Sequence, residues 1–374
     1  MKYFKTSLLV CLCVVMVLGL FVATSCAPAP PTGPTTPTAP TTPAAPTAPA
    51  EPIKIRLSTT MTEKSGLGQA YKHLTEEVEQ RLPGWFEFEF FWASSLVHSK
   101  DMEACGAGLT DLLFNIYPYR PEVYTLSTVE EILPFKPTRL QDVAKIRHQM
   151  WEEFPEMKDE TEHFGQKIIY ATVLPTYDVN SIMPLRTLDD FKGKKIGAVG
   201  ANFPKYCNAI GGTGVTVTVG DRYDQLNNKT IDASILSVDN MADYAHYEVA
   251  KYLTIVGFGA YCPGDVGMNF NLFNSFSPEV QQAWLDAGRA TEEWEWRNVE
   301  ALVERCYNTM EENGVEIIEL SEADRVEWAN ALKDFPAAWV QEGEAKGKPT
   351  REVLERYIEI CEGLGLEWAT EWQY

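Results

Sequence analysis

The chain has 374 residues, of which 53 are acidic and 32 are basic, so its formal net charge at neutral pH is −21. A hydrophobic fraction of 45% is typical of a globular protein and excludes a disordered chain. Nucleic-acid binding is disfavoured, because contacts with phosphate require a basic face. The same acidic balance disfavours attachment to anionic lipid by charge alone.

The N-terminus has the pattern of an export signal. Lys2 and Lys5 precede an apolar run over residues 8–23, which is shorter than the roughly 20 residues of a membrane-spanning helix. Small residues then lead to Cys26, which resembles a bacterial lipobox, although Ala23 replaces the usual leucine. The sequence therefore predicts a signal peptide at 1–25 and a lipid on the Cys26 thiol. A simple signal cut near Ala23 is the alternative.

A linker is expected to follow at residues 26–52. Residues 27–50 contain nine Pro, seven Thr, seven Ala and one Gly, a composition that cannot form a core and favours extended polyproline II. At about 3.1 Å per residue this segment reaches roughly 75 Å. We expect it to hold the folded part away from the outer face of the cytoplasmic membrane, on the periplasmic or extracellular side.

From Ile53 onward, strand and helix patterns alternate, which predicts an α/β fold. The first set of elements completes a parallel sheet with crossover helices. Its predicted segments are strands at 53–59, 86–90 and 112–116 and helices at 67–82 and 100–108.

A second set of alternating elements begins near residue 167. Its predicted strands are 167–174, 195–199, 215–219 and 233–236, with helices at 203–210 and 221–228. Segments 252–258 and 266–272 are predicted to be strands that return to the first sheet. We therefore expect lobe I at 53–174 plus 259–300, lobe II at 175–258 plus 301–374 with the C-terminal helices, and a ligand cleft between them.

The longest helical pattern covers residues 278–313, with Pro278 at its start and Gly314 after its end. At 1.5 Å per residue such a helix is about 50 Å long and spans both lobes. Two shorter helices broken within 292–297 are the alternative. Two further helices are predicted at 322–346 and 351–363.

The chemistry-bearing residues do not indicate an enzyme, a metal site or a cofactor. The folded part has an odd number of cysteines, none in a CxxC pair, so we expect mostly buried thiols, with one or two disulfides as the alternative. No nucleophile elbow, HExxH motif or phosphate-binding loop is present. The histidines are scattered, and we expect exposed imidazoles.

Several motifs in register resemble the solute-binding proteins of tripartite ATP-independent periplasmic (TRAP) transporters, the DctP-type family. The matching segments are Trp92-Ala-Ser-Ser-Leu96, Leu133-Pro-Phe135, Thr187-Leu-Asp-Asp-Phe-Lys-Gly-Lys-Lys-Ile196, Gly211-Gly212, Tyr223-x-x-Leu226 and Ile231-Asp232. The resemblance covers nearly all of the chain after Ile53. It implies a two-lobed periplasmic-binding-protein-like fold with a long helix spanning both lobes. It also implies a receptor that closes on a small organic solute and delivers it to membrane permease subunits.

The chain departs from this family where the family's carboxylate clamp is expected. The arginine that usually ends the "KGLKIR" motif is Gly197, and a second family arginine falls on Tyr177. A family aromatic falls on Gly220 and a family asparagine on Leu236. The usual bidentate clamp for a ligand carboxylate is therefore missing.

Two explanations of these departures stay open. In the first, another cation holds a carboxylate; the candidates are Lys194, Lys195, Arg222 and Arg120. In the second, which the sequence favours, the solute lacks a carboxylate or is cationic or polar-aromatic. Its contacts would then be stacking and hydrogen bonds from Tyr117, Tyr177 and Asp178.

Loops after strand ends are where an open α/β sheet offers its ligand crevice. By that rule the predicted ligand-binding residues are Thr60, Asn115, Tyr117, Tyr177, Asp178, Asn202, Phe203, Arg222, Ser234 and Asp239. Each has an alternative role in a turn or in the core. A ligand-sensing lipoprotein without a transport role is the alternative function.

Overall fold

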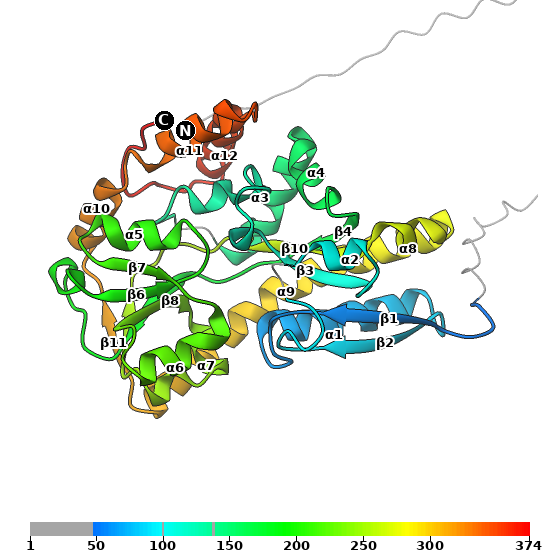
Figure 1. The fold of residues 1–374 in the computed structure, drawn as a ribbon, viewed down its shortest axis with the longest axis horizontal. Helices are drawn as coiled ribbons and strands as arrows, with labels where there is room; N and C mark the ends of the chain where they lie inside the picture. The colour runs from blue at the N-terminus through cyan, green and yellow to red at the C-terminus, as the bar shows by residue number, and fades with distance from the viewer. Residues whose placement is uncertain (1–47, 99–100, 137–138) are drawn as a thin grey trace, which may run out of the picture. The chain divides into compact units, whose positions relative to one another are not determined.

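The strands of the computed structural model, which describes residues 48–98, 101–136 and 139–374, form two sheets. The predicted signal peptide (1–25), Cys26 and most of the linker lie outside the described residues. The alternating pattern of β1 (Ile53–Ser58) shows why it forms an inner strand, since Ile55 and Leu57 are buried while Lys54 is exposed. The expected α/β fold is confirmed (Figure 1).

The first sheet has five strands and joins distant parts of the chain. Its order is β2 (Phe86–Phe91), β1, β3 (Leu112–Ile116), β10 (Gly264–Asn269) and β4 (Gln166–Ala171). As predicted, β1 is parallel to β2 and to β3. Strand β10 returns from the second half of the chain and runs antiparallel to β3 and β4.

The second sheet has six strands. Its order is β11 (Glu316–Glu319), β9 (Tyr252–Ile255), β5 (Tyr177–Ser181), β8 (Ala233–Ser237), β6 (Lys195–Ala198) and β7 (Thr213–Thr216). Strand β9 belongs here, so the prediction that 252–258 returns to the first sheet is wrong. Sequence analysis also missed β11, which pairs in parallel with β9 and completes this edge.

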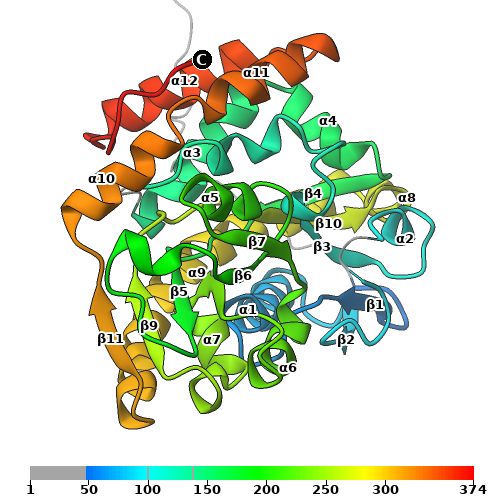
Figure 2. The same cartoon turned by 60° about the vertical axis from the view of Figure 1, so that its left-hand side comes forward.

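Helices cover both sheets. Their bounds are α1 (Gly66–Arg81), α2 (Glu103–Gly106), α3 (Leu140–Glu153), α4 (Glu156–Glu162), α5 (Phe203–Ala209), α6 (Arg222–Asn227), α7 (Val238–Asp243), α8 (Phe270–Ser275), α9 (Pro278–Glu312), α10 (Glu322–Ala331), α11 (Phe335–Ala345) and α12 (Thr350–Gly363). Short 3₁₀ turns lie at η1 (Tyr117–Tyr119), η2 (Ser127–Glu131), η3 (Leu188–Phe191), η4 (Val219–Asp221) and η5 (His246–Glu248). In Figure 2, α5 lies on one side of the second sheet and α6 and α7 lie on the other.

The long helix α9 is continuous, as the main prediction had it. Pro278 occupies its first turn, where a missing N–H costs nothing. Helix α9 packs against α1, α3 and β4 and also against α7 and β11, so it contacts both sheets' layers. The helix predicted at 322–346 is instead two helices, because Pro336 starts α11 after the turn at Leu332. Both α11 and α12 contribute to a core shared with α3.

Two extended segments cross between the sheets side by side. The first joins β4 to β5, and the second joins β9 to β10. They pair through the backbone of Leu174 and Tyr261, whose N–H groups each donate to the other's carbonyl. Together with α9 these segments form the connection about which two lobes can move.

The cysteines of the folded part are buried free thiols, as expected. This holds for Cys105, Cys207, Cys262, Cys306 and Cys361.

Close packing of α9 on β4 gives a test of the fold. A Cβ added at Gly288 would lie 2.2 Å from the Ile169 carbonyl oxygen, so the helix and the strand must separate. We expect Gly288→Ala to lower the free energy of unfolding by about 1–3 kcal/mol in urea titrations. The control is Gly363→Ala near the end of α12, where a Cβ meets nothing within 4 Å. Equal stability of the two variants would contradict this packing.

Candidate functional site

The second lobe contains a buried arginine, Arg222, that has no acidic partner among the described residues. Arg222 begins α6 and is 0% exposed. Its guanidinium donates to the carbonyls of Val217 and Ile235 and to the Ser234 hydroxyl. All three acceptors are neutral, and no carboxylate among the described residues lies within ion-pair distance of it. A buried cation in this state is costly unless a further anion completes its shell.

Three tyrosines surround this guanidinium. Burial lowers the pKa of Arg222, and the nearby phenols of Tyr177, Tyr119 and Tyr261 act in the opposite direction. The Tyr177 ring packs against Phe203 at 5.0 Å and against Tyr261 at 5.4 Å between centroids. The predicted residues Tyr177, Phe203, Arg222 and Ser234 are therefore brought together, with the aromatic rings forming an apolar wall beside the cation.

Beyond the end of β8, Asp239 lines a small cavity. Asp239 and Asn240 stand in the first turn of α7 and are each 3% exposed. The cavity measures about 10 Å³, which is close to the space needed for one water molecule. Its other walls are Met61, Ser65, Leu67, Phe114, Thr172, Val173, Leu174, Pro263 and Glu295. Residues from both lobes and from α9 thus meet at one point.

Glu295 was missed by sequence analysis. It lies near the middle of α9 and is 1% exposed. Burial raises the pKa of its carboxyl well above the usual value; the Val173 N–H opposes this shift and Glu292 adds to it. Helical spacing puts Gly288, Thr291, Glu295 and Val299 on one stripe of α9, and the structure shows that this stripe is buried.

The two lobes touch across the cleft. The Thr62 hydroxyl, after β1, donates to Asp243 of α7 at 2.6 Å. The Tyr244 hydroxyl reaches the Thr60 carbonyl at 3.4 Å, whereas the buried Thr60 hydroxyl has no hydrogen-bond partner among the described residues. Gly200, with φ +65°, approaches Pro118 so closely that a Cβ would lie 2.7 Å from it. These contacts join the two lobes in this structure.

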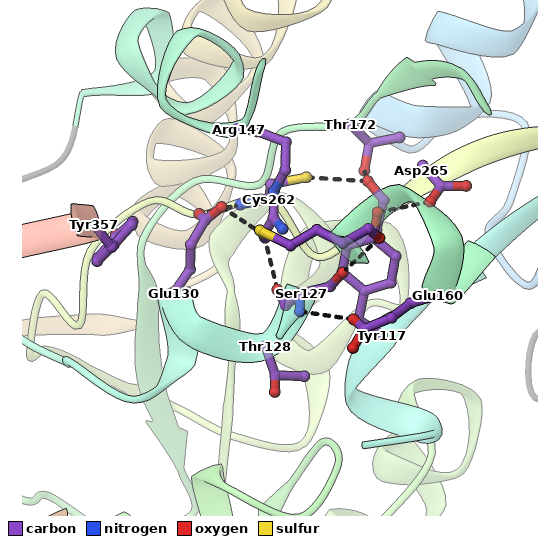
Figure 3. A network of polar contacts seen from close by, with 12 residues as sticks. Tyr117, Ser127, Thr128, Glu130, Arg147, Glu160, Thr172, Cys262, Asp265 and Tyr357 are labelled. Carbon is purple, nitrogen blue, oxygen red and sulfur yellow. Dashed lines mark hydrogen bonds and ion pairs between the residues drawn. The ribbon is translucent and has the colours of Figure 1, made fainter. Parts of the chain in front are cut away.

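Asn115 and Tyr117 lie in a polar network inside the first lobe, of which Figure 3 shows Tyr117, Asp265 and Arg147. The Tyr117 hydroxyl donates to Asp265 at 2.6 Å, and the Asn115 amide donates to the other oxygen at 2.8 Å. Buried Arg147 lies over the Tyr117 ring and pairs with Glu130 at 2.6 Å. Neither Asn115 nor Tyr117 lines the cavity beside Asp239. Strand β10 explains this, because its register places Asp265 directly opposite Asn115.

Asp178 ties the crossing segments together. One carboxylate oxygen accepts the backbone N–H groups of Val256 and Gly257, each at 2.8 Å, and the other accepts the Tyr307 hydroxyl of α9 at 3.2 Å. Burial raises the pKa of Asp178 to about 6, and these donors oppose the shift. Its position is that of a hinge residue.

Asn202 lies elsewhere in the cleft. Its amide donates to Glu131 of the first lobe at 3.1 Å. It lines a separate pocket of about 230 Å³ bounded by residues 121–128, Lys205 and α11. The structure thus does not bring Asn202 to the cavity of Asp239.

His246 is also buried, so the expectation of exposed imidazoles is wrong for it. Its Nδ1 lies 3.4 Å from the Asn180 amide, and its Nε2 has no partner among the described residues. Burial, together with nearby Arg222, lowers the pKa of His246 to about 3.

Comparison with known proteins identifies the family. The model of the bacterial extracellular solute-binding proteins, family 7 (DctP), matches residues 57–341. The chain belongs to this family. This match confirms the resemblance that the sequence motifs indicate.

A curated relative is the 2,3-diketo-L-gulonate-binding periplasmic protein YiaO of Escherichia coli (strain K12), 29% identical over 181 residues. The match covers 47% of this chain and 54% of the relative, so it spans about half of each.

Two solved members of the same fold illustrate the architecture. DctP6 of Bordetella pertussis, which binds pyroglutamic acid, has a TM-score of 0.73 and 18% identity over 82% of this chain and 99% of that one. A TRAP solute-binding protein of Desulfovibrio salexigens with bound orotic acid has a TM-score of 0.72 and 20% identity, covering 83% and 98%. At such identities the likeness shows the shared fold alone.

The buried imidazole gives a pH test. The folded-state pKa of His246 is lowered below its unfolded value near 6.5, so its neutral form stabilises the fold at neutral pH. This contribution falls as pH drops below about 6.5, by about 3 kcal/mol near pH 4.5. We expect wild type to lose more thermal stability than His246→Gln between pH 7 and 4.5. Parallel pH profiles for the two proteins would contradict this position of His246.

Proposed function

We propose that this protein is the extracytoplasmic receptor of a TRAP-type transporter and that it delivers a small organic acid to the membrane permease. The observation that carries the proposal is the buried guanidinium of Arg222, whose hydrogen-bond partners among the described residues are neutral. A carboxylate is the group whose geometry and charge best match a buried guanidinium.

Arg222 also accounts for the missing family arginine. Gly197, which replaces it, pairs in the sheet with Ser234, and Ser234 accepts a hydrogen bond from Arg222. Arg222, at the start of α6, therefore places a cation beside β8, the strand that pairs with Gly197. Of the two explanations left open by the sequence, this favours the first, in which another cation holds the carboxylate. The acids bound by the solved relatives, pyroglutamic and orotic acid, agree with it.

Lobe closure supplies the receptor step. The Thr62–Asp243 hydrogen bond and the close approach of Gly200 to Pro118 form only when the lobes meet. A solute that contacts both Arg222 and the opposite lobe stabilises only the closed form. Binding and closure are therefore coupled.

The carboxylate anchor is tested by substitution at Arg222. We expect Arg222→Met to weaken binding of organic acids by at least about 30-fold, because the cost of losing a buried charge partner is about 2 kcal/mol or more. Arg222→Lys keeps the positive charge but lacks the planar guanidinium, so its affinity for organic acids should lie between those of wild type and Arg222→Met. The control is Arg186→Met, which removes an exposed guanidinium paired with Glu316. Affinities come from calorimetry with pyroglutamate, galacturonate and orotate. Unchanged affinity in Arg222→Met would refute the anchor.

The remainder of the proposal concerns the membrane. Among the described residues no helix is long and apolar enough to cross a bilayer. The lipobox-like segment ending at Cys26 supports attachment through a lipid, with residues 27–50 as a spacer.

Membrane attachment is tested by Cys26→Ala in the full chain. We expect the variant to be released from the membrane fraction, because the thiol that receives the lipid is gone. Cys13→Ala, within the apolar run of the signal, is the control and should remain attached. Retention of the Cys26→Ala protein on membranes would exclude the anchor.

A further inference from the structure

The cavity beside Asp239 has an unusual balance of polar atoms. Three lining oxygens have no hydrogen-bond partner among the described residues: Asp239 Oδ1, Asn240 Oδ1 and Glu295 Oε2. Asn240 Oδ1 is an acceptor, and the Asp239 and Glu295 oxygens are acceptors when their carboxyls are ionised; the three side chains are between 1% and 3% exposed. The remaining polar side chains of the wall are satisfied, since Ser65 donates to the Thr62 carbonyl and Thr172 to the Gly264 carbonyl.

The orientation of these acceptors is fixed by their neighbours. The Asn240 amide nitrogen donates to the Ser237 hydroxyl at 2.8 Å, so its oxygen is the atom left for the cavity. Asp239 and Asn240 come from the second lobe, and Glu295 comes from α9. The three side chains therefore share one cavity where α7 packs against the long helix.

Buried acceptors without donors are costly, and buried carboxylates most of all. A cationic nitrogen removes this cost, because an ammonium group brings a positive charge and three N–H donors and no acceptor. Met61, Phe114 and Leu174 contribute apolar walls to the same cavity and lower the local dielectric constant there. This raises the strength of a charge-assisted hydrogen bond there.

The cavity lies near the anchor of opposite sign. Tyr177 of β5 pairs in the sheet with Ser237, the last residue of β8. Asp239 follows β8 by two residues, and Arg222 is bonded to Ser234 and Ile235 of that strand. One end of the site thus favours an anion and the other favours a cation.

We infer that the solute is zwitterionic: Asp239, Asn240 and Glu295 receive its cationic nitrogen, while Arg222 holds its carboxylate. This inference rests on the proposed function and narrows its substrate class to amino acids and their N-alkylated relatives.

Matched ligands test the inference directly. The panel contains the twenty common L-amino acids, the 2-hydroxy acid of each skeleton, and the amine that lacks the carboxylate. Binding is measured by thermal shift and then by calorimetry. We expect at least one amino acid to bind, and to bind about tenfold or more tightly than its hydroxy acid.

Variants then assign the preference to residues. Glu295→Gln and Asp239→Asn preserve shape and remove charge, so both should fold, and each should reduce the preference for amino over hydroxy acid by about tenfold. Glu293→Gln is the control, because Glu293 is exposed and pairs with Arg297 on the same helix. A thermal melt of each ligand-free variant verifies folding.

The outcomes separate the two claims. If hydroxy acids bind as tightly as amino acids, or if the preference survives both substitutions, the zwitterion inference is wrong while the acid receptor stands. Amines binding as tightly as amino acids would refute the role of Arg222 instead. Absence of binding across the whole panel would contradict the zwitterion inference, and binding of the plain acids in the Arg222 experiment then decides the proposed function separately.

Discussion

The buried guanidinium of Arg222 is the constraint around which the cleft is organised. Placing a permanent cation at 0% exposure costs free energy that neutral acceptors recover only in part. Carbonyls of Val217 and Ile235 fix its direction, so the charge is held in place before any solute arrives. In the receptor proposed above, an anion that reaches Arg222 meets a preorganised side chain, so its binding free energy is not spent on ordering that side chain.

The segments that cross between the lobes are connected to helix α9 by hydrogen bonds. Asp178 joins the crossing segments to Tyr307 of α9 through three hydrogen bonds. The same helix carries Glu295, whose carboxylate lines the cavity between the lobes. Movement of the second lobe therefore changes the distance between the Arg222 side of the site and the α9 side. A solute that contacts both sides stabilises one hinge angle.

The sequence predicted the fold well because its signals are local. Alternation in 53–59, the Pro278 start of α9 and motifs such as 187–196 depend on neighbouring residues alone. Elements without such signals were missed or misassigned: β11 has four residues, and β9 was assigned to the wrong sheet because pairing is a non-local property. The turn between α10 and α11 was overlooked although Pro336 marks it.

The site was harder to predict because the position of each side chain depends on hydrogen-bond partners far away in the sequence. Asn115 and Tyr117 satisfy the strand-end rule, yet Asp265, some 150 residues later, engages both. Glu295 resembles any acidic residue on a helix surface until its stripe is seen to be buried. Arg222 was one of several candidate cations, and the structure distinguishes it by its burial and its neutral partners.

A crystal structure with the strongest-binding solute tests the central claim most directly. The account predicts a solute carboxylate within about 2.7–3.2 Å of the Arg222 guanidinium, with Gly200 still against Pro118. A solute held in the pocket beside Asn202, with Arg222 bonded only to Val217, Ser234 and Ile235, would contradict it.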